Sequence, residues 1–239
     1  MEQLGLQFQE LSRVLSAGSG APDPDRLVAF AASAVPHGEG CGLTLTRGSG
    51  RPATVASSGP VAVQVDKIQY ESGEGPCLEA AEGHDLVRVG DLGTDQQWPE
   101  FARRCVAETG IHNIFSVRLA LPGGDRAALN FYAHRPDSLD DLDVGTGALL
   151  GPFAALAVRT AMQQRQLGQL ETALNSSRQI GTAVGILMAR RLVTAEKAFD
   201  LLVGASQHLN RKLRDVAVEV EETGTLPQRP APRRPGPRR

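Results

Sequence analysis

The fold is organised around residues 176–191, which read SSRQIGTAVGILMARR and combine small residues, a compact apolar block and flanking arginines in one predicted helix. Gly181 and Gly185 are four residues apart and therefore share one face of that helix. An interior glycine weakens a helix by about 1 kcal/mol relative to alanine, so a close approach should offset this cost. The approaching group is either a neighbouring helix or a ligand such as RNA.

Length and composition are those of an ordinary globular protein: the chain has 239 residues, 41% hydrophobic and 22% charged. No apolar run reaches the roughly 18 residues that a membrane span needs, and no basic segment followed by an apolar block opens the chain. Cys41, Cys77 and Cys105 are odd in number and far apart, which favours a reduced, cytoplasmic protein. The five histidines are scattered, so we expect no metal site.

Charge divides the chain into two halves. Residues 1–158 carry a formal net charge of −9, and residues 159–239 carry +7. A polyanionic partner is therefore expected to bind the rear half. The last stretch, 228–239, holds five arginines and four prolines without an acidic residue, and we expect it to be disordered.

The front half predicts an α+β domain with an antiparallel sheet covered by helices. Residues 4–15 have apolar side chains at helical spacing, and residues 41–46 alternate as a strand with one buried face. Further elements follow from the same two periodicities: helices at 24–34, 61–70, 76–80 and 98–109, and strands at 53–57, 86–89, 115–121 and 126–134. Residues 122–125 form the turn of a hairpin between the last two strands.

Several segments of this half resemble a GAF domain, the small-molecule sensor module of bacterial regulators. The resemblance is strongest to the GAF domains of actinobacterial regulators. The resemblance covers about residues 8–158 and rests on Gln69-Tyr70, Gly75-Pro76-Cys77-Leu78, Asp91-Leu92, Trp98-Pro99, 116–119 and 128–132. It implies a domain that binds a small molecule or that dimerises. It implies no particular cofactor, and an unknown small-molecule ligand stays open.

Two residues are candidates for a sensor pocket. Cys77 follows a glycine turn at a predicted helix start, where a thiol can become reactive, but packing as a small apolar side chain is the simpler interpretation. Arg118 lies within a strand, where it either pairs with an acidic ligand or faces solvent, and the alternation favours solvent. Haem ligation by His84 or His112 is the weaker alternative to a surface or core role.

The connector, residues 159–175, continues a helical pattern that begins near Asp140. Gly151-Pro152 predicts a kink or a break. Beyond it, Ala161, Leu167, Leu170 and Leu174 form a partial heptad. This stripe is either a dimer contact or a face packed on the same chain, and we favour the dimer.

Residues 166–227 resemble an ANTAR domain, the RNA-binding module of transcription antitermination regulators. The matching positions include Ala173-Leu174, Ser177-Arg178, Ile180-Gly181, 185–188, Ala198-Phe199, Leu201-Leu202, Ser206, Asn210 and 212–214. The resemblance implies an all-α, three-helix output unit that works as a homodimer and binds paired stem-loops in a nascent RNA leader. Many members carry a lysine where this chain has Val184, so one candidate phosphate or loop contact of the family is absent.

The residues support three helices on their own terms. The first ends near Arg190-Arg191, Thr194 is placed to cap the second, and Gly224 follows the third, which we expect to start near Leu209. The candidate RNA contacts carry basic, amide or hydroxyl side chains that suit phosphates or unpaired bases. They are Arg178, Gln179, Arg190, Arg191, Ser206, Asn210, Arg211, Lys212 and Arg214, with Gly181 and Gly185 assigned to close helix packing.

These patterns favour a signal-responsive, RNA-binding antitermination regulator without catalytic residues. A DNA-binding regulator that uses the last two helices is the alternative. An enzyme is disfavoured, because residues 159–191 contain no histidine for phosphoryl transfer and the chain shows no phosphate-binding loop or serine elbow.

Overall fold

The computed structural model describes residue 13 and residues 23–227 of the chain. It contains two compact units, Met1–Gln164 and Arg165–Arg239, which are described separately below. The predicted tail at 228–239 lies outside the described residues, and so does the predicted helical start at 4–15, apart from Arg13.

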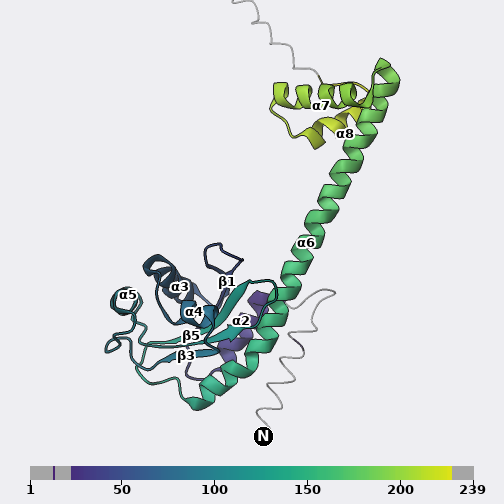
Figure 1. Ribbon diagram of the computed structural model, residues 1–239. Helices are drawn as coiled ribbons and strands as arrows, with labels where there is room; N and C mark the ends of the chain where they lie inside the picture. Colours follow the sequence, from purple (N-terminus) through teal and green to yellow (C-terminus); the bar gives the residue numbers. More distant parts are fainter. Residues whose placement is uncertain (1–12, 14–22, 228–239) are drawn as a thin grey trace, which may run out of the picture. The chain divides into compact units, whose positions relative to one another are not determined.

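The front unit is built on a five-stranded antiparallel sheet with the strand order β2-β1-β5-β4-β3 (Figure 1). Its strands are β1 (Gly40–Thr46), β2 (Ala53–Ser57), β3 (Leu86–Val89), β4 (Asn113–Leu119) and β5 (Arg126–Ala133). Its helices are α2 (Pro24–Ala34), α3 (Pro60–Ser72), α4 (Pro76–Glu82), α5 (Pro99–Thr109) and the first part of α6 (Asp141–Arg191). The predicted α+β class is confirmed.

Helices cover both faces of this sheet. Helix α2 and the first part of α6 pack on one face against apolar side chains such as Leu43, Phe131 and Phe115. The rings of Phe115 and Phe131 stack there with their centroids 4.5 Å apart. Helices α3 and α4 cover the opposite face, and α5 packs against α3. The expectation of one exposed face for residues 41–46 is therefore wrong, because every residue of β1 is buried.

The face under α3 and α4 carries a buried polar network. Asp66 of α3 accepts hydrogen bonds from the hydroxyl groups of Thr54 and Tyr132 and from the amide of Asn130. Tyr70 lies one turn further along α3, and its hydroxyl oxygen forms a hydrogen bond with Thr44 Oγ1 at 2.8 Å. Burial raises the pKa of Asp66 to about 6, although its hydrogen bonds act in the opposite direction. The network ties α3 to strands β1, β2 and β5.

Helix α6 runs without interruption from Asp141 to Arg191, so the helix is not broken at Pro152, and the alternative of a kink there stays a prediction. Leu150 and Ala154, on either side of the proline, are buried against the sheet and hold the helical path in place. By length and composition α6 is apolar enough to cross a membrane, which the sequence had not led us to expect, but half of its most apolar window is buried. Packing on the sheet accounts for that apolar character.

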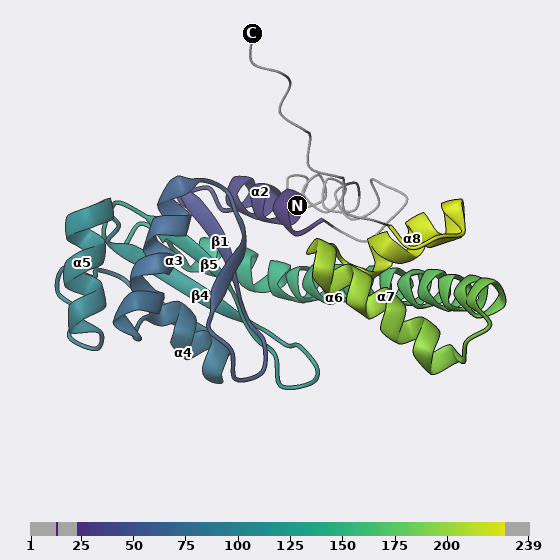
Figure 2. The same ribbon diagram turned by 90° about the horizontal axis from the view of Figure 1, so that it is seen from above.

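The rear unit is a small three-helix arrangement formed by the end of α6 with α7 (Ala195–Leu209) and α8 (Leu213–Thr223), which lie side by side (Figure 2). Thr194 caps α7 by accepting a hydrogen bond from the N–H of Lys197. Gly224 ends α8 with a φ of 72° in the left-handed region, as predicted. Leu209 closes α7, so the expectation that it begins the third helix is wrong. The core consists of Ala183, Leu187, Ala198, Leu202, Val216, Ala217 and Val220.

Candidate nucleic-acid interface

The turn between α7 and α8 gathers several of the predicted RNA contacts. Asn210 occupies the left-handed region with a φ of 51° and ends α7, a conformation that asparagine tolerates better than most residues. The hydroxyl group of Ser206 donates to the carbonyl of Arg211 at 2.6 Å. Ser206 and Asn210 therefore shape the turn, and the exposed Lys212 follows directly before α8.

The arginines of this turn form ion pairs within the rear unit. Arg211 lies 2.5 Å from a carboxylate oxygen of Glu219 in α8, and Arg214 lies 3.3 Å from Asp215. Exposed pairs of this kind contribute little to stability and separate readily in favour of a phosphate. Both arginines stay candidates, but their charge is partly neutralised before any ligand arrives.

Helix α6 supplies the other predicted contacts, and the structure separates them into two groups. Arg178 and Arg191 are exposed, and Gln179 is half-buried. Arg190 packs its guanidinium group over the end of α8, so close that a Cβ added at Gly224 would meet it at 2.5 Å. A guanidinium group beside the last carbonyls of a helix stabilises that helix end. No sequence pattern indicated this contact between Arg190 and the end of α8.

The predicted role of Gly181 and Gly185 in close packing of the three helices is wrong. Both glycines are exposed, and a Cβ added at either position would meet no atom within 4 Å. Ala183 and Leu187, which are also four residues apart, form the face of α6 that packs on α7 and α8. The glycine face is therefore directed away from the core of the rear unit.

The two sensor-pocket candidates of the front unit lie where the simpler interpretations place them, Cys77 in the core and Arg118 on the surface. Cys77 is fully buried, and burial together with the charge of Asp66 raises the pKa of its thiol well above the usual range. Its backbone N–H donates to Gln69 Oε1 at 2.9 Å. Arg118 is the one exposed residue of β4 and lies 3.7 Å from Asp85. Neither lines the cavity described below.

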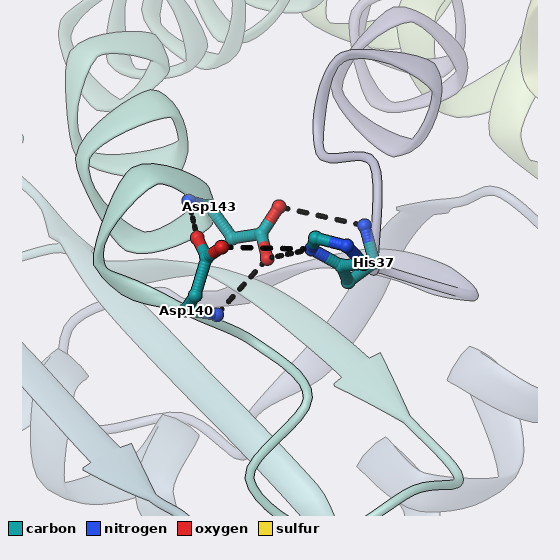
Figure 3. Close-up of side chains that lie close together, drawn as sticks. All are labelled: His37, Asp140 and Asp143. Atoms are coloured by element: carbon teal, nitrogen blue, oxygen red, sulfur yellow. Dashed lines mark hydrogen bonds and ion pairs between the residues drawn. The ribbon is translucent and has the colours of Figure 1, made fainter.

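A cluster that the sequence spacing did not reveal lies at the start of α6 (Figure 3). The ligating atoms of His37, Asp140 and Asp143 all lie within 4.8 Å of one another. Asp140 Oδ1 accepts the backbone N–H of Asp143 at 2.9 Å, and Asp143 Oδ2 accepts that of Asp140 at 3.0 Å. This reciprocal pattern caps a helix start. His37 Nδ1, 2.8 Å from Asp143, fastens the loop after α2 to the capped end.

The rear unit thus presents exposed basic side chains on a compact helical scaffold. Residues 168–220 match the family model described as "ANTAR domain". The ANTAR domain expected from the sequence is confirmed, and it indicates an RNA-binding regulator of transcription antitermination. No curated protein sequence matches the chain at a significant level.

Solved structures similar to this chain include two GAF domains and an enzyme. The GAF domain of a phosphoenolpyruvate-protein phosphotransferase from Coxiella burnetii is 15% identical, covering 67% of this chain and 96% of that one, with a TM-score of 0.49. The corresponding domain from Acinetobacter is 12% identical, covering 67% and 98%, with a TM-score of 0.49. Free methionine-R-sulfoxide reductase from Neisseria meningitidis is 16% identical, covering 68% and 93%, with a TM-score of 0.47.

Proposed function

We propose that the protein is a cytoplasmic, homodimeric antitermination regulator whose front unit senses a signal and whose rear unit binds paired stem-loops in nascent RNA. The observation that carries the proposal is the ANTAR match over residues 168–220. Bound stem-loops would prevent a terminator hairpin from forming, so transcription would continue. The proposal assigns no enzymatic activity and no resident cofactor.

The surface chemistry of the rear unit supports RNA as the partner. Arg178, Arg191 and Lys212 are exposed, and no ion pair within the described part of the chain is assigned to them. Lysine and arginine contacts to phosphates dominate the affinity of such interfaces and make it dependent on salt. Gln179 and Asn210 would contact base edges of unpaired loop nucleotides, as proposed from the sequence.

Exposed leucines on α6 support a homodimer. Leu167, Leu170 and Leu174 are between 56% and 62% exposed, and they follow the three- and four-residue spacing of a coiled-coil seam. In the front unit, Leu142, Leu149 and Leu156 are also exposed and recur every seven residues. Six leucines at heptad spacing are unusual on a solvent-exposed helix face, and a second copy of α6 would bury them.

A gel-shift titration with a tandem pair of hexaloop stem-loops tests the proposal. We expect the full-length protein to bind the pair, and to bind one isolated stem-loop more weakly because a dimer engages two sites. A matched RNA with scrambled loops is the control. Absence of a shift at low salt, with protein shown by sedimentation to be dimeric, would rule out the proposed function.

Duplex DNA is the alternative partner, and one observation favours testing it. Only Asn210, Arg211 and Lys212 separate α7 from α8, which is the three-residue connection of a helix-turn-helix motif. The same titration therefore includes a duplex of equal length. Equal affinity for duplex DNA and for the stem-loop pair would favour the DNA-binding alternative.

A further inference from the structure

The front unit contains a cavity of about 370 Å³ that neither the proposed RNA surface nor the predicted sensor residues use. Its walls come from the hairpin between β1 and β2, the end of α3, the α3–α4 turn, α4 and the residue before α5. A volume of this size is within the range of small-molecule sites. The cavity lies beside the turn 73–75, where the backbone changes direction between α3 and α4.

The charges around the cavity are predominantly acidic. Glu74, Glu79 and Glu82 line it, against the single basic residue Arg126. Glu74 uses Oε1 to accept the backbone N–H groups that begin α5, at 2.8 and 2.9 Å, and Glu79 uses Oε2 to accept the amide of Gln97 at 2.8 Å. Arg126 is 3.7 Å from Glu82 and offsets only one of the three charges. A cation is therefore the ion that this cavity favours.

Two aromatic residues contribute to the lining. Tyr70 and Trp98 both contribute to the walls, and the faces of such rings attract ammonium groups. Gly75, another lining residue, lies directly against Gln69, since an added Cβ would come within 2.5 Å of its Oε1. The Nε2 atom of Gln69 is buried and has no hydrogen-bond partner among the described residues. Gln69 is not itself a lining residue, so the preference of the cavity for a cation rests on its carboxylates and aromatic rings.

We propose that this cavity binds a small organic ammonium ion. The carboxylates of Glu79 and Glu82 hold its cationic group, and the rings of Tyr70 and Trp98 flank it. The inference deepens the proposed sensing function of the front unit and rests on it for the biological role of the ligand. Occupancy itself is independent of RNA and can be measured without it.

Trp98 makes the test direct, because it is the only tryptophan of the chain and it lines the cavity. Full-length protein is titrated with ethanolamine and choline, which combine an ammonium group with a hydroxyl oxygen, while tryptophan fluorescence is recorded. We expect a saturable change with a Kd in the range of about 10 µM to 1 mM. Raising the ionic strength should weaken binding. Acetate, which carries the opposite charge, should produce no saturable change.

Two variants with matched charge changes locate the site. Glu79→Gln combined with Glu82→Gln removes both proposed counter-charges while preserving side-chain size, and should raise the Kd by a factor of about 5 or more. Asp85→Asn combined with Asp141→Asn also removes two charges, from side chains that are 96% and 98% exposed and outside the cavity, so the Kd of this control should stay unchanged. Circular dichroism confirms that both variants are folded.

The proposal is overturned by an absence of saturation up to about 10 mM, or by equal weakening in both variants. Binding of acetate as strongly as choline would also overturn it. These outcomes are distinct from failure of the RNA proposal, because the gel shift is carried out without any ammonium ligand. Loss of RNA binding with intact fluorescence titration would leave the cavity assignment standing.

Discussion

The two units differ in how much of their chain they bury. The front unit encloses Tyr132, Phe101, Phe115 and Phe131 completely, in two cores on opposite faces of its sheet. The core of the rear unit contains seven buried residues, none larger than leucine. Burial of apolar area is the main stabilising contribution, so the front unit is expected to be self-sufficient and the rear unit marginal. The rear unit, which has the smaller core, is therefore the one whose stability gains most from a partner.

The largest effect is expected in the front unit. Phe131→Ala removes a fully buried ring that stacks on Phe115 and should lower the free energy of unfolding of this unit by about 3–5 kcal/mol. Urea unfolding followed through Trp98, which lies in the same unit, measures the change. A loss below about 1 kcal/mol would contradict the description of this core as tightly packed.

The buried carboxyl group of the front unit predicts a dependence on pH. The folded-state pKa of Asp66 is raised to about 6 from 3.8, so the folded state holds this proton more strongly than the unfolded state. Stability contributed by the protonated form is therefore present below pH 4 and lost as the pH rises to 6, by about 3 kcal/mol. Asp66→Asn keeps the size of the side chain and should remove this component.

Unfolding curves of the wild type and of Asp66→Asn at pH 4.5 and pH 7.5 isolate the effect, because all other carboxyl groups titrate in both proteins. Asp85→Asn, at an exposed position in the same unit, should follow the wild type. An identical pH dependence in Asp66→Asn and the wild type would show that the burial of this carboxyl group does not affect stability.

A substitution in the core of the rear unit tests whether this unit is only marginally stable. Leu202→Ala removes one of the two buried leucines of its core and should lower its free energy of unfolding by about 2–3 kcal/mol. That loss is smaller than for Phe131 but larger in proportion, so we expect the helical signal of the rear unit to melt at physiological temperature while Trp98 reports an intact front unit. Simultaneous melting of both units would mean that they do not fold independently.

The sequence was sufficient where local periodicity decides the structure. Alternation located the hairpin of β4 and β5, and Gly110 and Gly224 marked the ends of α5 and α8 in the left-handed conformation that glycine favours. Local patterns failed where packing against another element decides. Pro152 does not break α6 because Leu150 and Ala154, on either side of it, pack on the sheet. Strand β1 is buried on both faces because α2 and α3 pack on it, which the alternation of its own residues does not indicate.

The candidate interface shows the same limit. Net charge correctly separates a basic rear from an acidic front, since that property is additive along the chain. Which arginine makes a contact within the rear unit is not additive. Arg190 packs against Gly224 and Arg211 pairs with Glu219, and both contacts depend on how α8 is placed against its neighbours. The cluster of His37, Asp140 and Asp143 escaped notice for the same reason, because more than a hundred residues separate the histidine from Asp143.

The smallest effect is expected at the glycine face of α6. Substitutions there test whether Gly181 and Gly185 contact a partner molecule. Gly181→Ala and Gly185→Ala should each stabilise the unit by about 0.5–1 kcal/mol, because alanine favours a helix and has open space at both positions. Gly168→Ala, also in open space, is the matched control for the gain in stability. If the glycines serve a close intermolecular approach, only the first two substitutions weaken RNA binding.

Sedimentation then distinguishes the two partners that the sequence left open. Weaker dimerisation together with weaker RNA binding would identify a second copy of α6 as the group that approaches Gly181 and Gly185. Weaker RNA binding by an unchanged dimer would identify the RNA itself. A variant that is more stable and binds as the wild type does would show that neither partner reaches this face, and the exposed surface of the rear unit would then be limited to its basic groups.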